Sequence, residues 1–187
     1  WARGVDTELF HPDKRHMDGK SVYEGIEGPI FVYIGRVAVE KNIESFLDLD
    51  LPGTKVVVGP GPQLEELKEN YPEVVFTGNK SGDELARHFA DADVMVFPSF
   101  TDTFGLVMIE ALACGTPVAA FPVPGPRDIV TEQVGALSEN LDRAIAAALF
   151  CDRKTCADYG AGFSWSAATG QFLAGLAALE PEALPSA

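Results

Sequence analysis

Short apolar runs alternate with amphipathic segments along most of the chain, and this alternation starts at Pro29. The runs are rich in Val, Ile and Phe, and most of them end at Gly, Pro or a polar residue. Continuous apolar runs of this kind are typical of strands that are buried on both faces. The expected strands are 30–34, 55–58, 74–77, 93–97 and 117–121, and the expected helices are 40–49, 62–71, 83–90, 106–113, 139–149, 153–159 and 164–179.

Strands that alternate with helices predict a parallel sheet covered on both faces, which is a doubly wound, Rossmann-like α/β domain. Residues 13–28 are polar and irregular and are expected to form a loop, and residues 181–187 are expected to fray. The stretch 122–128 contains three prolines and predicts a stiff, extended loop. Open α/β sheets bind ligands beyond the carboxyl ends of their strands, so we expect a site where the apolar runs end.

The composition fits a single soluble domain with a sizeable core. Of the 187 residues 47% are hydrophobic and 22% are charged, and there is no run of 18 apolar residues. The formal net charge is −14, with 28 acidic and 14 basic residues, which argues against nucleic acid or anionic lipid as a partner. A phosphate ligand is not excluded, because an Arg at contact range outweighs distant, screened charges.

The cysteines and histidines do not form a metal or disulfide pattern. Cys114, Cys151 and Cys156 are odd in number and lack a C-x-x-C spacing, and the three His residues are scattered. We therefore expect neither a metal site nor a disulfide framework. Free thiols are typical of a reducing cytoplasm, which is the expected location.

Glu110 is the only charged residue between Asp102 and Arg127. The helix around it is apolar on nearly every face and is therefore expected to be buried. A buried carboxylate without a partner is costly, so we expect Glu110 to have one. The alternative is that Glu110 lies on the one exposed strip of a half-buried helix.

The start of this helix is a predicted anion site. Phe104 and Gly105 end a polar loop and open the helix, whose first N–H groups and positive dipole end point at whatever precedes them. Glu110 lies five residues further on, roughly 7 Å along the axis, with its Cβ tilted back toward the same end. A phosphate at the helix start would place an attached ribose near Glu110.

A dinucleotide-dependent dehydrogenase is the obvious competitor for this fold, but it would carry a G-x-G-x-x-G motif after its first strand. The first predicted strand is followed by Gly35-Arg36-Val37 instead. The second is followed by Gly-Pro-Gly-Pro at 59–62, which lacks the third Gly and contains two residues without a backbone N–H. The sequence therefore disfavours this class.

The stretch around Glu110 resembles the signature of the retaining glycosyltransferases of the GT-B fold, family 4 or group 1. In that family two acidic residues are separated by seven others, and Asp102 and Glu110 match them. The family usually has Glu at the first position, so Asp102 is a departure with a shorter side chain. The residues that carry the resemblance are Pro98, Ser99, Asp102, 104–107, 110–113, Gly115, Pro117 and Val118.

The resemblance implies roles for residues at several strand ends. Arg36 and Lys41 match a pair that binds the donor's diphosphate, although a solvated ion pair with Glu40 or Glu44 is the alternative. A Gly-x-Gly-Pro turn and the next strand end match positions near the nucleotide, with turn chemistry alone as the alternative. The implied donor-binding residues are Arg36, Lys41, Gly61, Gly78, Phe104, Gly105, Leu106, Val107 and Glu110, and the implied catalytic residues are Asp102 and Glu110.

By this resemblance the chain is the donor-binding, C-terminal domain of an enzyme that transfers a hexosyl group from a UDP- or GDP-sugar with retention. The acceptor would be a glycan, a lipid or another hydroxyl compound, and neither a metal nor another cofactor would be required. Residues 1–28 would lead in from a missing N-terminal domain, 29–162 would bind the nucleotide sugar, and 163–187 would form a crossover helix and tail.

The missing domain would carry most of the acceptor site, so we expect the isolated chain to be inactive and any peripheral membrane contact to run through that domain. A stripe of Trp165, Phe172, Leu176 and Leu179 on the crossover helix is then expected to be half exposed. Two other classes remain open. One is a different GT-B enzyme, such as a nucleotide-sugar epimerase or a phosphorylase, and the other is a non-catalytic nucleotide-binding module, which the departure at Asp102 favours.

Overall fold

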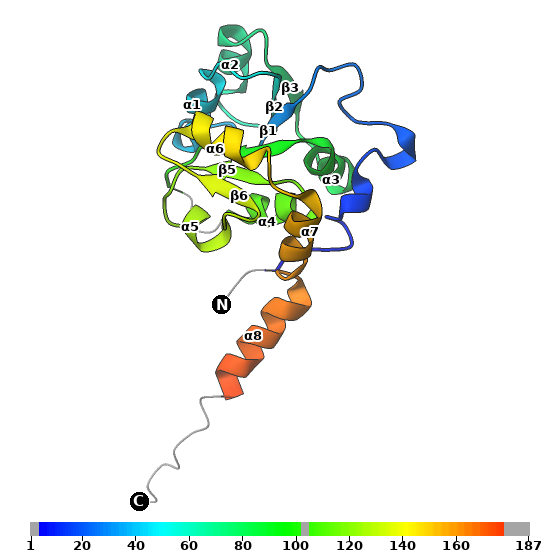
Figure 1. The fold of residues 1–187 in the computed structure, drawn as a ribbon. Helices are drawn as coiled ribbons and strands as arrows, with labels where there is room; N and C mark the ends of the chain where they lie inside the picture. Colours follow the sequence, from blue (N-terminus) through cyan, green and yellow to red (C-terminus); the bar gives the residue numbers. More distant parts are fainter. Residues whose placement is uncertain (1–3, 102–104, 178–187) are drawn as a thin grey trace, which may run out of the picture.

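A parallel sheet forms the centre of the molecule (Figure 1). The computed structural model describes residues 4–101 and 105–177, and within these ranges six strands form one sheet in the order β3-β2-β1-β4-β5-β6. Every neighbouring pair is parallel. The strands are β1 (Ile30–Ile34), β2 (Thr54–Val58), β3 (Val75–Gly78), β4 (Val94–Phe97), β5 (Val118–Ala120) and β6 (Gly135–Leu137).

Helices cover both faces of the sheet, which confirms the doubly wound α/β prediction. One apolar core lies between the sheet and α1, α2 and α6, and a second lies between the sheet and α3, α4 and α7. The helices are η1 (Pro12–Lys14), η2 (Met17–Gly19), η3 (Val39–Lys41), α1 (Glu44–Leu47), α2 (Leu64–Asn70), α3 (Gly82–Asp91), α4 (Leu106–Ala113), α5 (Pro126–Ile129), α6 (Leu141–Ala148), α7 (Arg153–Ala161) and α8 (Trp165–Ala177).

Two local predictions are wrong. The expected helix over 40–49 is divided into η3 and α1, because Asn42 adopts a left-handed conformation with φ of 52° and its Nδ2 donates to the carbonyl of Pro98 at 3.0 Å. The expected extended loop over 122–128 contains the start of α5. There Gly125, with φ of 92°, turns the chain, and Pro126 occupies the first helical turn, where its missing N–H is not needed.

The predicted loop over 13–28 contains only the short helical turns η1 and η2, and it is fastened to the end of α3. The buried carboxylate of Asp91 accepts from the backbone N–H groups of His16 at 2.6 Å and Val22 at 2.7 Å. The hydroxyl of Tyr23 donates to the carbonyl of His88 at 2.9 Å. The loop therefore packs on the domain that follows it, and the predicted boundary at residue 28 stays a prediction.

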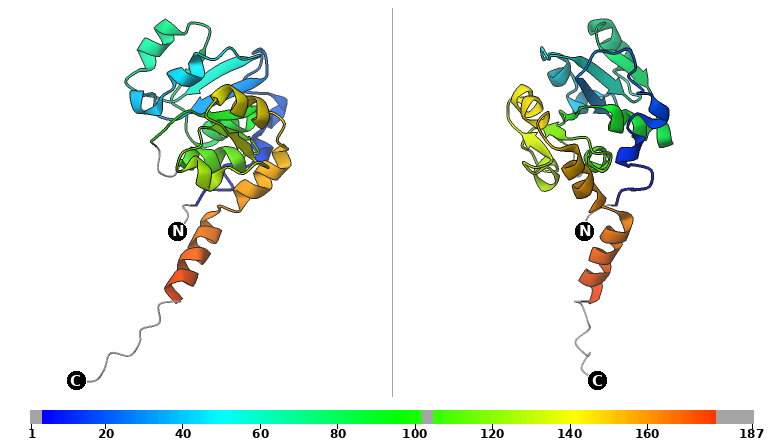
Figure 2. Two further views of the ribbon diagram at one scale, coloured as in Figure 1. Left: turned by 60° about the vertical axis from the view of Figure 1, so that its left-hand side comes forward. Right: turned by 45° about the vertical axis from the view of Figure 1, so that its right-hand side comes forward.

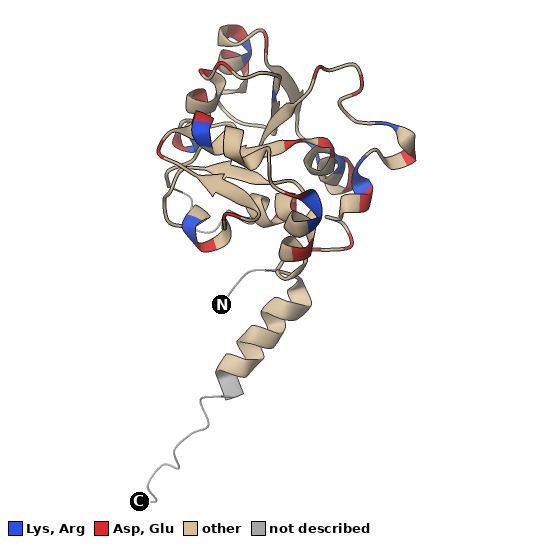
Figure 3. Ribbon diagram, in the orientation of Figure 1, with Lys and Arg blue, Asp and Glu red and all other residues tan. Residues whose placement is uncertain are grey.

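Helix α8 projects from the rest of the molecule (Figures 1 and 2), and it has no charged side chain (Figure 3). Ser164 caps it by accepting from the N–H of Ala167 at 3.2 Å. Trp165 is 60% exposed and Phe172 is 44% exposed, which confirms the expected exposure of the apolar stripe for these two residues. The side chain of Leu176, together with Leu179, lies outside the described part of the chain.

The loops that follow β1 and β2 touch backbone to backbone. The N–H of Val37 donates to the carbonyl of Pro60 at 2.8 Å. A Cβ at Gly61 would lie 1.9 Å from the carbonyl oxygen of Val37, and one at Gly59 would lie 1.9 Å from that of Gly35. Both glycines are required by this close approach, whereas a positive φ, the basis of the turn interpretation, occurs at Gly59 and not at Gly61.

Replacing Gly61 tests this contact. Gly61→Ala is expected to lower the free energy of unfolding by about 2 to 3 kcal/mol, because the backbone at Val37 has to move aside. Gly170→Ala is the matched control, since a Cβ there meets nothing within 4 Å and the position lies in α8. Urea denaturation followed by circular dichroism measures both variants, and equal stabilities would contradict the role given to Gly61.

Candidate functional site

The site lies at the carboxyl edge of the sheet, where the strand order reverses between β1 and β4. This is the position at which open α/β sheets bind ligands. The ends of β1, β2 and β3 border a cavity of about 160 Å³ together with α3 and α4. Its lining residues are Ile34, Gly35, Val58, Gly59, Pro60, Asn79, Lys80, Leu85, Val107 and Glu110.

Glu110 brings the only carboxyl group of α4 to the wall of this cavity. Its neighbours Met108, Ile109 and Ala111 are fully buried, and burial raises the pKa of Glu110 from 4.5 to about 7. Within the described residues its carboxyl group makes no hydrogen bond and no ion pair. The expectation that the protein supplies a partner is therefore not met there, and the group lines a cavity instead.

Gly105 fixes the start of α4. Its φ of 60° and ψ of 59° are left-handed, and a Cβ there would lie 2.5 Å from Cε of Met108. The first-turn residues Leu106 and Val107 are half-buried, and their N–H groups lie at the positive end of an eight-residue helix. Val107 also lines the cavity, so the expected anion site and the expected ribose site are contiguous in the fold. The predicted residues Asp102 and Phe104 lie outside the described part of the chain.

Arg36 follows β1 and is largely exposed. Its Nη1 lies 3.4 Å from Oε1 of Glu40, so the alternative of a solvated ion pair is confirmed for this residue. Such exposed pairs contribute about 0 to 1 kcal/mol, and a phosphate can compete with Glu40 for the guanidinium. Lys41 is half-buried in η3, next to Glu40.

Among the residues of the cavity wall that the sequence analysis did not assign to the site, two are polar. Asn79 and Lys80 follow β3 directly, and Lys80 forms an ion pair with Glu84 of α3. The predicted residue Gly78 ends the same strand with φ of 73°. The signal that identifies Asn79 and Lys80 is their position, because the ends of parallel strands meet at one edge of a sheet.

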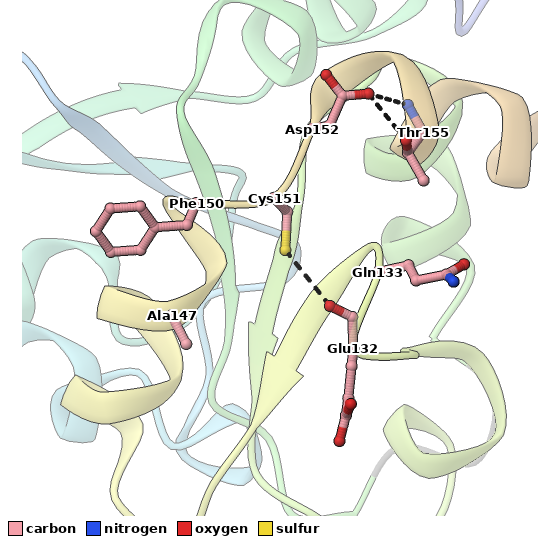
Figure 4. Close-up of a pocket in the computed structure, with 7 residues that line it drawn as sticks. All are labelled: Glu132, Gln133, Ala147, Phe150, Cys151, Asp152 and Thr155. Atoms are coloured by element: carbon pink, nitrogen blue, oxygen red, sulfur yellow. Dashed lines mark hydrogen bonds between the residues drawn. The ribbon is translucent and has the colours of Figure 1, made fainter.

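A second hollow, of about 480 Å³, lies at the amino edge of the sheet, before β6 and between α6 and α7 (Figure 4). Its polar groups are mostly engaged in local structure. Asp152 caps α7 by accepting from the N–H and the hydroxyl of Thr155, both at 2.8 Å, and Cys151 donates to the carbonyl of Glu132 at 4.0 Å. Unlike the cavity at the carboxyl edge, this hollow is not bordered by the carboxyl ends of strands, and Asp152 already caps the helix that starts there.

In the ranges that the structure covers, no three His, Cys, Asp or Glu side chains are grouped so that they could hold a metal ion. Likewise, none of the helices in those ranges is both long and apolar enough to cross a membrane.

The raised pKa of Glu110 makes stability depend on pH. The folded chain keeps this proton up to about pH 7, whereas the unfolded chain releases it near 4.5, so stability falls as pH rises through this window. Glu110→Gln is therefore expected to raise the free energy of unfolding above pH 7 by about 1 to 3 kcal/mol and to change it little at about pH 5. Chemical denaturation at both pH values measures this, with the exposed Glu139→Gln as control. A gain that does not vary with pH would contradict the assignment.

Two glycosyltransferases are similar in sequence to this chain. The sulfoquinovosyl transferase SQD2 of Arabidopsis thaliana is 38% identical over 140 residues, which are 71% of this chain and 27% of that protein. A GDP-mannose-dependent alpha-mannosyltransferase of Mycobacterium tuberculosis is 37% identical over 155 residues, or 78% of this chain and 41% of that protein. The chain thus spans less than half of the length of these two relatives.

A solved structure and a family-wide comparison agree with these relatives. Sucrose-phosphate synthase from Thermosynechococcus elongatus has the same fold with a TM-score of 0.75 at 29% identity, over 95% of this chain and 52% of that chain. The family described as group 1 glycosyl transferases matches residues 28–151, a range that includes the described sheet and the whole wall of the Glu110 cavity. The chain therefore belongs to the group 1 glycosyltransferases, the GT-B family that its acidic motif resembles.

Proposed function

We propose that the chain binds the nucleotide sugar donor and that the full-length protein transfers the hexosyl group to a hydroxyl acceptor with retention of configuration. The observation that carries the proposal is the Glu110 carboxyl group, which is half-buried, has no protein partner among the described residues and lines a cavity at the carboxyl edge. A buried carboxylate of this kind is stabilised when ligand hydroxyl groups donate to it. Two adjacent ribose hydroxyls are suitable donors.

The start of α4 would determine how the proposed ligand is oriented. With the ribose at Glu110, the diphosphate would lie at the N–H groups of Leu106 and Val107, where the helix dipole favours negative charge. Arg36 and Lys41 would add positive charge from the end of β1 and from η3. These groups stabilise the diphosphate as it leaves, which is the electrostatic part of catalysis, and we propose that they do so without a metal ion.

The remaining parts of the proposed reaction lie outside the described residues. By the family resemblance, Asp102 would orient the sugar, and an N-terminal domain of the full-length protein would carry most of the acceptor site. The chain matches less than half of the length of these relatives, which supports a further domain in the full-length protein. The isolated chain would then bind a nucleotide without transferring sugar.

Calorimetric titration with UDP, GDP and ADP tests the donor site. GDP is the first choice, because the mycobacterial relative is named for GDP-mannose. We expect saturable binding of one nucleotide, weakened about tenfold or more by Glu110→Gln, since a hydrogen bond to a charged group contributes about 1.5 to 3 kcal/mol. Arg36→Ala should also weaken binding, whereas the exposed Arg143→Ala should not. Equal nucleotide affinities in the unaltered chain and its three variants would contradict the proposed site.

Binding should also depend on pH. The free Glu110 carboxyl group titrates at about pH 7 and accepts hydrogen bonds more strongly, and on both oxygens, when it is ionised, so affinity for the nucleoside is expected to rise as pH increases through 7. Titration with the uncharged nucleoside avoids the ionisation of the phosphate itself. Glu110→Gln should abolish this dependence, and a dependence that persists in the variant would assign the titration to another group.

Product analysis tests the reaction in the full-length protein. The anomeric configuration of the product, followed by NMR from the start of turnover, should equal that of the donor. Asp102→Ala is expected to lower kcat with little effect on nucleotide affinity. An inverted product, a free isomerised sugar or unchanged turnover in the variant would each contradict the proposed reaction, and the last would favour a binding role alone.

A further inference from the structure

Phe100 is an exposed aromatic residue at the carboxyl edge that the donor site does not use. It follows β4, is 53% exposed and stacks on Phe121, which follows β5 and is 8% exposed. The two ring centroids are 4.4 Å apart, and the ring planes form an angle of 26°. One face of the Phe100 ring is therefore covered by protein.

The backbone around Phe100 is held in place on both sides. Before it, Ser99 is buried, and the carbonyl of Pro98 accepts from Nδ2 of Asn42 at 3.0 Å. After it, the hydroxyl of Thr101 donates to the carbonyl of Glu40 at 3.4 Å. A ring that is stacked on a buried neighbour and carried by a fastened loop loses little freedom when it binds a ligand.

The position of the ring relative to α4 is the second part of the argument. The Glu110 cavity lies over the ends of β1, β2 and β3, and the start of α4 follows β4. Phe100 and Phe121 follow β4 and β5, which lie on the other side of β1 from β2 and β3, two of the strands whose ends border the cavity. A ligand with its nucleoside in the cavity and its diphosphate at α4 would direct its next group toward this side.

We propose that Phe100, supported by Phe121, is a stacking platform for a pyranose ring, either the hexose of the donor or a sugar of the acceptor. This inference rests on the proposed function. The face of an aromatic ring is electron-rich and attracts the polarised C–H groups on the apolar face of a sugar, while the sugar hydroxyls stay in water. Val39, which is 73% exposed and adjacent to Glu40, adds apolar surface beside the same loop.

The test compares Phe100→Ala with Phe150→Ala in the full-length protein. Phe150 is 91% exposed at the opposite edge of the sheet, so its removal controls for the loss of an exposed ring. Three quantities are measured: the Kd of the nucleoside diphosphate, the Kd of the nucleotide sugar and the KM of the acceptor. Phe100→Trp serves as the conservative variant.

Phe100→Ala is expected to leave the Kd of the nucleoside diphosphate unchanged and to raise one of the other two constants about tenfold, the upper part of what an aromatic contact contributes. A raised Kd for the nucleotide sugar identifies the donor hexose as the occupant, and a raised acceptor KM identifies the acceptor sugar. Phe100→Trp should leave the Kd of the nucleotide sugar and the KM of the acceptor unchanged.

Three results would contradict the proposed role of Phe100. These are constants equal to those of Phe150→Ala, an equal loss of affinity for the nucleoside diphosphate, or a lowered melting temperature without any selective change in a sugar constant. The last would make Phe100 part of an interface with another segment of the protein. Failure of the unaltered protein to bind any nucleoside diphosphate would instead refute the proposed function, so the two failures are distinguishable.

Discussion

The burial of α4 is the constraint on which the rest of the structure depends. The helix is enclosed by the sheet, α3 and α7, and the contact with α7 is so close that a Cβ at Gly160 would lie 2.2 Å from the backbone N of Ala113. Arg153 of α7 reinforces the assembly by donating to the carbonyls of Ala90 and Ala92 at the end of α3. An enclosed helix has to be apolar. Its close packing fixes the position of its first turn at the carboxyl edge of the sheet.

Glu110 is an exception in this apolar helix, because ionisation of its carboxyl group weakens the fold, and we propose that a ligand offsets this loss. Its ionisation is unfavourable in the free chain and becomes favourable when hydroxyl groups donate to it, so stability and affinity draw on the same group. The acidic net charge of the whole chain does not oppose an anionic ligand locally, because Arg36, Lys41 and the start of α4 are much closer than the scattered carboxylates.

The sequence predicted the parallel sheet and the edge that carries the site, because buried strands and strand-end turns leave strong patterns. It missed β6, whose Gly135, Ala136 and Leu137 contain no β-branched residue. It joined η3 and α1 into one helix, since the left-handed conformation of Asn42 that separates them depends on a contact with Pro98, which is distant in sequence. The missing partner of Glu110 and the exposure of Phe100 are tertiary properties that no local pattern encodes.

The projecting helix α8 has a consequence for how the chain behaves in solution. Its exposed Trp165, Phe172 and Leu173 form a neutral, apolar surface on a protein of net charge −14. At low ionic strength the repulsion between acidic domains keeps such surfaces apart, whereas salt screens that repulsion and strengthens apolar association. The isolated chain should therefore stay monodisperse in dilute buffer and associate increasingly as the salt concentration is raised.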